Sequence, residues 1–271
     1  WGDHGMLGFA LDPDFLSNGR FYVMYAVDRH HLLYFGTPAY DPFVSEPNAA
    51  SIVRITRYTA LAPGYLVADP ASRTILLGET LSTGAPILYN THGAGTLLFA
   101  RDGTLIASIG EGASAASTDA GNATESYFAQ GLADGIIREE ENVGAFRAQL
   151  VNSFSGKILR MDPATGNGVP SNPFFDPAAP RAPRSRVWAL GLRNPYRLTL
   201  KPGTGSTEPT DADVGTLLIG DVGWSNWEEH NVCTEPGQNF GWPLFEGMES
   251  SSYATVLTYN RDEPNPLFNG T

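Results

Sequence analysis

A histidine beside two glycines is the first candidate for chemistry in this chain. His92 stands just before an apolar segment that is expected to form a strand, and Gly93 and Gly95 let another group approach closely. An imidazole has an unperturbed pKa of ~6.5, near the pH at which most enzymes work, so it suits a general base. A surface or purely structural histidine is the alternative, and the residues alone leave both open.

The second candidate is the pair Arg193 and Asn194 in the segment GLRNP. The pair follows the apolar run 187–192, and Pro195 restricts Asn194 to extended geometry. A planar guanidinium and an amide at the rigid end of a strand can bind a planar, anionic group. The alternative is that Arg193 forms an ordinary ion pair within the fold.

The segment 220–242 has the composition of a site for a hard cation. Ca²⁺ binds about six to eight oxygens, drawn from carboxylates and from backbone carbonyls at irregular turns. Glu228 and Glu229 are acidic candidates within this segment, whereas Asp221 could buttress its turn by accepting from backbone N–H groups. A solvated acidic loop followed by a packed FGWP turn is the alternative.

Short antiparallel strands are the elements expected to position these residues. The 271 residues include 30 Gly and 20 Pro, which favours many strands joined by turns over long helices. Four segments pair apolar runs around turn residues and predict hairpins: 6–26, 50–77, 96–110 and 197–222. Hairpins repeated along an all-β chain favour a β-propeller, with a sandwich as the alternative.

Two long insertions interrupt the strand pattern, at about 28–50 and 111–150. Within the second, the segment 127–150 has Ala, Glu and Arg at helix-like spacing, which predicts one or two short helices. Residues 1–271 are expected to form a single propeller domain of about four blades, as a segment of a longer chain.

The overall charge excludes some classes of partner. The net charge of −12 disfavours nucleic acid and electrostatic attachment to an anionic membrane, and no apolar run approaches the ~18 residues of a membrane span. A single cysteine, Cys233, excludes an intramolecular disulfide and has no basic neighbour that would make it a nucleophile.

Four longer stretches carry a family resemblance. They are GDHGMLGFALDPDFLSNGRFYVMY, THGAGTLLFARDGTLIASIGEG, SGKILRMDPATGNGVPSNPF with VWALGLRNPYRL, and GDVGWSNWEEHNVCTEPGQNFGWPLFEG. In order and content they resemble the soluble quinoprotein glucose/sorbosone dehydrogenases, or PQQ-dependent aldose sugar dehydrogenases. The resemblance implies a six-bladed β-propeller that binds pyrroloquinoline quinone (PQQ) and Ca²⁺ and oxidises an aldose at its anomeric carbon. It also implies an external electron acceptor and a periplasmic or secreted location.

The resemblance assigns roles to both candidate segments. His92 would be the base that takes the proton from the C1 hydroxyl of the sugar while hydride passes to the quinone. Arg193 would reach the redox face of PQQ, with Asn194 lying against the cofactor.

The resemblance also suggests substrate and metal residues. Asp3, Thr91 and Glu111 occupy positions near the substrate or the mouth of the active site, although Asp3 could equally be a turn former. The positions that match calcium ligands of the family are Gly223, Trp224, Glu229 and Phe240.

Two departures from the family pattern keep other functions open. The well-studied glucose oxidisers have an acidic residue where this chain has Thr91, and the cations that hold the carboxylates of PQQ are expected beyond Thr271. The 271 residues alone are therefore expected to bind PQQ poorly. The main alternative is a non-catalytic propeller that binds carbohydrate or protein. A hydrolase or lyase that uses Glu111 with His92 is a weaker one.

Overall fold

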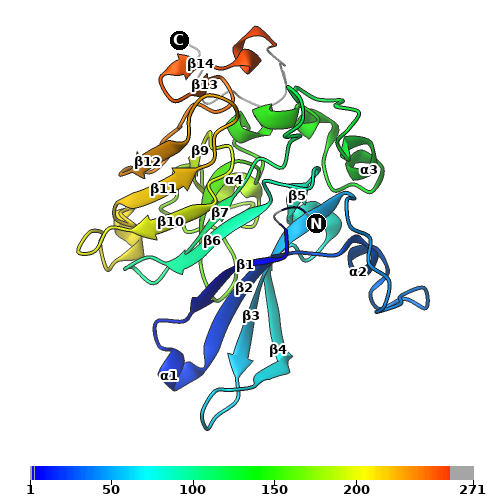
Figure 1. Cartoon of the computed structure of the whole chain (residues 1–271). Helices are drawn as coiled ribbons and strands as arrows, with labels where there is room; N and C mark the ends of the chain where they lie inside the picture. Colours follow the sequence, from blue (N-terminus) through cyan, green and yellow to red (C-terminus); the bar gives the residue numbers. More distant parts are fainter. Residues whose placement is uncertain (1, 3, 257–271) are drawn as a thin grey trace.

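Antiparallel strands dominate the regular structure, as the sequence predicts. The computed structural model describes residue 2 and residues 4–256, so Asp3 lies outside the described residues. The described strands form three larger sheets that follow one another along the chain, and a two-stranded sheet after them (Figure 1). The all-β class is confirmed.

The first sheet has the order β1–β2–β3–β4, and a short fifth strand pairs with the start of β3. Its strands are β1 (Met6–Leu11), β2 (Arg20–Ala26), β3 (Ser51–Ala60), β4 (Ala68–Leu77) and β5 (Ala85–Ile87). The pairings β1–β2 and β3–β4 confirm the first two predicted hairpins.

The second sheet has the order β6–β7–β8–β9 and the third the order β10–β11–β12. The strands are β6 (Ala94–Phe99), β7 (Leu105–Ile109), β8 (Lys157–Met161), β9 (Val187–Leu190), β10 (Arg197–Leu200), β11 (Leu217–Asp221) and β12 (Glu229–Cys233). A two-stranded pair follows, made of β13 (Phe245–Glu246) and β14 (Glu249–Ser250). The other two predicted hairpins are confirmed as β6–β7 and β10–β11.

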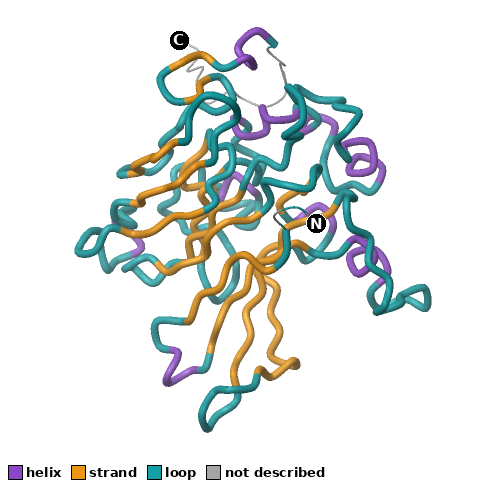
Figure 2. Tube along the Cα trace, viewed as in Figure 1, coloured by secondary structure: helices purple, strands orange, loops and turns teal. Residues whose placement is uncertain are grey.

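The helices are short and lie in the connections (Figure 2). They are α1 (Phe15–Asn18), α2 (Arg29–Tyr34), η1 (Leu81–Thr83), α3 (Phe128–Ala133), η2 (Glu139–Glu141), η3 (Gly144–Gln149), α4 (Pro183–Arg186), η4 (Pro209–Asp211) and η5 (Ser252–Thr255). Helices α3, η2 and η3 confirm the short helices predicted in the second insertion. Across the described ranges, no helix has both the length and the apolar character needed to cross a bilayer.

The three sheets meet through their first strands. Strand β6 packs against β1 on one side and against β10 on the other (Figure 1). One core fills the space between the first two sheets, with members Met24, Ile55, Leu97 and Leu159. A second core joins the next two sheets, with members Ile106, Ile158, Leu198 and Ile219. Neighbouring blades of a propeller pack in this way, while closure into six blades and the number of blades stay predictions.

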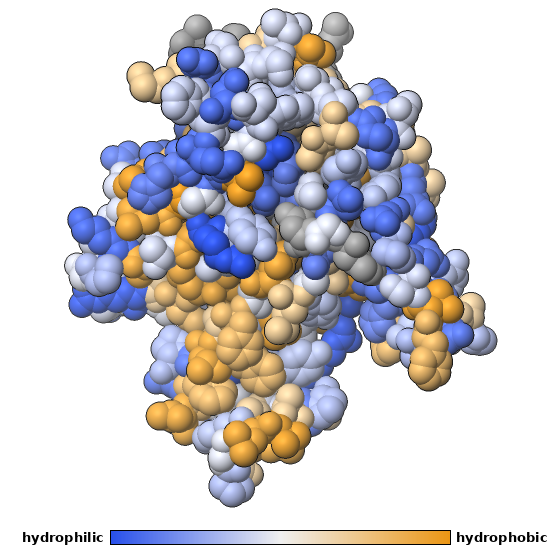
Figure 3. All heavy atoms as spheres, in the orientation of Figure 1, coloured by the Kyte–Doolittle hydropathy of each residue, from blue (hydrophilic) through white to orange (hydrophobic). Residues whose placement is uncertain are grey.

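The opposite face of the first sheet carries exposed apolar side chains. Phe9 is 54% exposed, and its ring lies 5.9 Å from that of Phe21, which in turn stacks on Tyr58 at 5.8 Å. Figure 3 shows hydrophobic side chains gathered at the lower end of the molecule, where Figure 1 draws β1–β4. A face of this kind is typical of a surface that packs against another element.

A buried ion pair connects the second sheet to the loops at its outer end. Asp102, in the turn between β6 and β7, accepts from Arg160 of β8 at 2.7 Å, and neither side chain is exposed. Arg160 also donates to the hydroxyl of Ser171 and to the carbonyl of Pro209. Asp102, which lies at the turn of the predicted hairpin 96–110, is therefore also the counter-ion of a buried arginine.

Removing this counter-ion should be costly. Asp102→Ala leaves the Arg160 guanidinium buried and uncompensated, so we expect the free energy of unfolding to fall by about 3–5 kcal/mol. Urea denaturation measures the change. Asp14→Ala is the control, because Asp14 is exposed and its side chain makes no capping bond, and it should stay within about 0.5 kcal/mol of the wild type. Equal loss in both variants would contradict this assignment.

Candidate functional site

The loops that carry the predicted base and the predicted cation lie side by side. His92 precedes β6, Glu111 follows β7, and Arg193 follows β9. Backbone bonds join them: the Glu111 N–H donates to the carbonyl of Arg193 at 2.8 Å, and the Gly112 N–H donates to that of His92 at 3.1 Å. Segments that are distant in sequence thus form one site.

His92 and Glu111 form a buried pair. His92 Nδ1 lies 3.0 Å from Glu111 Oε1, and the two residues are 4% and 0% exposed. Trp242 Nε1 donates to the other oxygen, Oε2, at 2.6 Å. A carboxylate can only accept, so Nδ1 carries the proton and the lone pair of the neutral ring is on Nε2. An imidazole in this tautomer is prepared to accept a proton at Nε2.

The backbone at His92 is held in an uncommon conformation. Its φ is 58°, in the left-handed region that favours glycine. Gly110 makes this possible, because a Cβ on Gly110 would lie 2.3 Å from the His92 carbonyl oxygen. Backbone strain of this kind costs about 1–3 kcal/mol and clusters at functional sites, where the surroundings maintain it.

Arg193 and Asn194 are fixed by a buried carboxylate. Asp221 accepts from the backbone N–H of Arg193 at 3.0 Å and of Asn194 at 2.6 Å, so it buttresses the loop after β9 and not its own turn as predicted. Burial raises the pKa of the Asp221 carboxyl to about 7, although the two N–H groups act in the opposite direction. The Arg193 guanidinium donates to the carbonyls of Val222 and Gly223, at 3.0 and 2.7 Å.

Three buried polar atoms at the site have no hydrogen-bond partner among the described residues: Thr91 Oγ1, Arg193 Nε and Asn194 Oδ1. Buried polar groups are nearly always bonded. These atoms offer one hydroxyl, one cationic donor and one amide acceptor, on loops that backbone bonds hold together. The hydroxyl and the cationic donor suit the carbonyl and carboxylate oxygens of a planar ligand such as PQQ, and the amide oxygen suits a ring N–H of such a ligand.

The turn 223–227 is closed by another buried carboxylate. Glu246 Oε1 accepts from the backbone N–H groups of four consecutive residues, at 2.5, 2.9, 3.2 and 3.4 Å from 224 to 227. Burial alone would raise the pKa of Glu246, but the four N–H groups hold it below its usual value. Sequence analysis gave Glu246 no role, although the EG pair that contains it belongs to the motif it singled out.

The predicted calcium ligands are partly engaged by other groups. The Gly223 carbonyl accepts from Arg193, and the Trp224 N–H donates to Glu246. Glu229 accepts from Gly247 N and from Asn231 Nδ2, and it lines a cavity of about 540 Å³ with Phe240. Within the described part of the chain, no group of three or more His, Cys, Asp or Glu side chains could hold a metal. Because the Glu229 carboxylate and the Gly223 carbonyl already accept from protein donors, the set as it stands fits calcium poorly.

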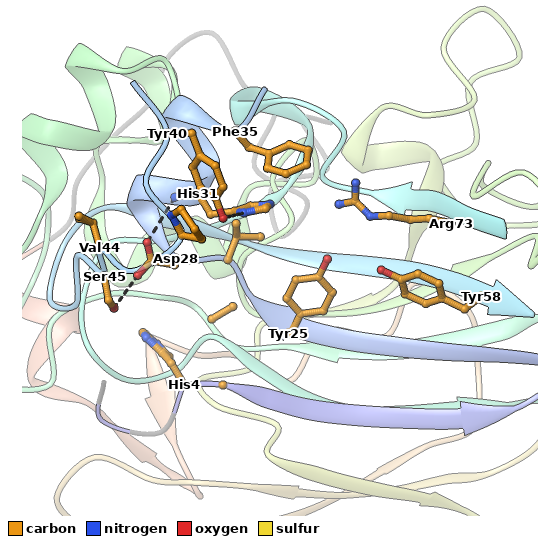
Figure 4. A pocket seen from close by; sticks show the side chains of 14 residues that line it. His4, Tyr25, Asp28, His31, Phe35, Tyr40, Val44, Ser45, Tyr58 and Arg73 are labelled. Atoms are coloured by element: carbon orange, nitrogen blue, oxygen red, sulfur yellow. Dashed lines mark hydrogen bonds between the residues drawn. The ribbon is translucent and has the colours of Figure 1, made fainter. Parts of the chain in front are cut away.

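A larger cavity of about 810 Å³ lies between the first sheet and the insertion 28–50 (Figure 4). Tyr25, Tyr58 and Arg73 point into it from the strands, and His31 and Phe35 from the insertion.

The cavity also reaches the segment of the proposed base. His4 lines it, and its ring is the nearest neighbour of Gly93, where a Cβ would lie 3.2 Å away. One end of the cavity therefore borders the backbone next to His92.

Loss of the Glu246 carboxylate should open the turn 223–227. Glu246→Ala would leave buried N–H groups without an acceptor. We therefore expect the free energy of unfolding to fall by about 2 kcal/mol and proteolysis at this turn to become faster. Glu249→Ala is the matched control, because Glu249 pairs with Glu246 across β13 and β14 but is exposed. If both variants behave alike, the four bonds do not stabilise the turn.

Calcium should not stabilise the protein without cofactor. An ion at about 100 times its Kd would contribute about 2.7 kcal/mol, which corresponds to a rise in Tm of roughly 5–10 °C. We expect no such difference between calcium and EGTA, measured by calorimetry. A rise that Glu229→Gln removes would show that the predicted calcium residues bind the ion.

Comparisons with known proteins agree with the motifs. The sequence model described as Glucose / Sorbosone dehydrogenase matches residues 1–265. The chain is similar to the HIPL1 protein of Arabidopsis thaliana, with 26% identity over 268 residues that cover 91% of this chain and 34% of that protein. It is also similar to quinoprotein glucose dehydrogenase B of Acinetobacter calcoaceticus, with 25% identity over 260 residues. The match covers 96% of this chain and 44% of that protein.

A solved structure supports the fold. The PQQ-bound form of aldose sugar dehydrogenase from Streptomyces coelicolor matches with a TM-score of 0.54 and 24% identity, over 93% of this chain and 52% of that one. The chain thus spans between about a third and a half of the length of these proteins. The family match extends over nearly all of the sequence and contains every motif described above. The chain belongs to the glucose/sorbosone dehydrogenase family.

Proposed function

We propose that this chain carries the proton-accepting part of a PQQ-dependent aldose dehydrogenase. The observation that supports it best is the buried pair of His92 and Glu111, joined through backbone bonds to the segment of Arg193 and Asn194. The family supplies the reaction class, and two of the similar proteins are a quinoprotein and a PQQ-bound enzyme. The substrate is an aldose, oxidised at its anomeric carbon to the lactone.

His92 performs the proton transfer. Nε2 takes the proton of the C1 hydroxyl, and the imidazolium that forms keeps its Nδ1–H bond to Glu111. The carboxylate stabilises this positive charge within a site that excludes water, where charge interactions are strong. PQQ, when bound, supplies the acceptor for the hydride that leaves C1.

Glu111 orients the base and does not contact the sugar. It has no exposed surface, and its two oxygens are engaged by His92 and Trp242. This assignment replaces the substrate role that sequence analysis gave it. Thr91 keeps its proposed substrate role, because its hydroxyl, unlike the carboxylate of Glu111, has no hydrogen-bond partner in the described residues. Asp3 keeps its proposed role from the sequence alone.

Arg193 and Asn194 would hold the cofactor through Nε and Oδ1. The guanidinium already donates to two carbonyls through Nη1, so its plane is fixed. Calcium is left out of the proposal because the Gly223 carbonyl and the Glu229 carboxylate already accept from protein donors. An external electron acceptor and a periplasmic or secreted location belong to the proposal by family membership.

Dye reduction tests the proposal. The full-length protein is reconstituted with PQQ and assayed with a panel of aldoses, and His92→Ala should lower kcat by about 10²–10⁴. His230→Ala is the control, because this histidine is exposed on β12, and it should keep full activity.

Other outcomes distinguish the alternatives. Turnover that survives His92→Ala would exclude His92 as the base. No turnover, together with no PQQ-induced rise in Tm, would leave the carbohydrate- or protein-binding propeller as the function.

A further inference from the structure

Trp242 is the residue that touches both functional parts of the site. Its indole N–H donates to Glu111 at 2.6 Å, and Glu111 in turn bonds His92. The centre of the Arg193 guanidinium lies 5.4 Å from the centre of the same indole ring. One side chain therefore contacts the partner of the proposed base and the proposed cofactor-binding cation.

The main chain of Trp242 is fixed on both sides. Its N–H donates to the carbonyl of Gly191 at 2.9 Å, just beyond β9. Its carbonyl accepts from Gln149 Nε2 at 2.6 Å, at the end of the insertion 111–150. The residue is 3% exposed, so the indole has little freedom to move.

Neighbouring aromatic rings complete the support. Tyr253 packs edge-on against Trp242, with ring centres 5.3 Å apart, and edge-on against Trp224 at 5.0 Å. The Arg193 guanidinium lies over both indoles, at 5.4 and 5.7 Å. The Tyr253 hydroxyl accepts from the backbone N–H of Asp119 at 3.0 Å, which ties the insertion to this cluster.

We propose that Trp242 is a positioning residue that holds Glu111, and through it His92, in a fixed relation to Arg193. The proposal rests on the proposed function for its kinetic consequence, but its structural consequence can be measured without turnover. Trp242 does not itself contact the reacting atoms.

Only an indole provides both contacts. The N–H is needed because Glu111 Oε2 is buried, and a buried carboxylate oxygen without a donor is unfavourable. The ring is needed because a guanidinium is attracted to an aromatic face. A phenyl ring can still lie beside the Arg193 guanidinium but has no N–H to donate to Glu111. Trp242→Phe therefore tests the hydrogen bond separately from the ring contact.

Another buried tryptophan, Trp188, supplies a matched control. Trp188 on β9 is 1% exposed, and its ring lies 5.1 Å from the Arg160 guanidinium. It belongs to the core between the second and third sheets and makes no bond to Glu111. Trp188→Phe therefore removes the same volume beside an arginine as Trp242→Phe does, but it leaves Glu111 and His92 unchanged.

The first measurement uses the protein without cofactor. In ¹⁵N spectra of labelled histidines, with His92→Asn to assign the signal, the wild type should show the tautomer protonated at Nδ1. We expect Trp242→Phe to mix the two tautomers, because Glu111 is no longer held from its other side, and Trp188→Phe to leave the signal unchanged.

The second measurement uses the holoenzyme with an aldose. Trp242→Phe should lower kcat by about 10- to 100-fold, because a small misplacement of the base has an effect of that size. The KM for the sugar should change by less than about threefold, since no substrate contact is removed. Trp188→Phe should keep kcat within about threefold.

The outcomes separate this proposal from the proposed function. An unchanged His92 signal in Trp242→Phe, or an equal loss of kcat in both tryptophan variants, would overturn the positioning role. A changed signal in a protein that never oxidises an aldose would support the positioning role and reject the dehydrogenase. If Trp242→Phe fails to fold, β-(3-benzothienyl)alanine at 242 removes the N–H, keeps the indole shape and permits both measurements.

Discussion

The buried carboxylate of Glu111 is the constraint on which the site depends. A carboxylate with no exposed surface is unfavourable unless both of its oxygens find donors. Here one oxygen meets His92 and the other meets Trp242. These two residues are 150 positions apart, so satisfying one charge brings together the loop before β6 and the loop after β12.

Two other buried acids organise the site in the same manner. Asp221 accepts from the backbone at Arg193 and Asn194, and Glu246 accepts from the turn that follows Asp221. Each acid fixes a loop through its N–H groups, so the loop keeps its shape without a regular element. Arg193 then links the two, because its guanidinium donates to the Val222 and Gly223 carbonyls that lie between them.

The hairpins were predictable because their signals are local. Turn residues and alternating apolar positions specify β1–β2 or β6–β7 within about 20 residues, and each pairing is antiparallel between neighbours. The motifs also singled out His92 and Arg193, whose loops the structure places side by side.

Their partners were not predictable for a physical reason. Trp242 acts through one side-chain bond to Glu111, and Glu246 through four bonds to a turn that lies before it in the sequence, and no periodicity records such bonds. Calcium binding stays a prediction for a related reason. Carbonyl ligands depend on where backbone oxygens point, and here Arg193 takes the Gly223 oxygen.

Two buried cationic side chains near Glu111 donate to backbone carbonyls of this chain. Arg147 donates to the carbonyls of Glu111 and Glu141, and Lys157 donates to three carbonyls around the end of the insertion 111–150. Burial lowers the pKa of Lys157 well below its usual value. These two side chains support the loop of Glu111 and the end of the insertion 111–150. The loops that carry His92, Glu111 and Trp242 are therefore held in place by charged groups of this chain as well as by the bonds of Glu111 itself.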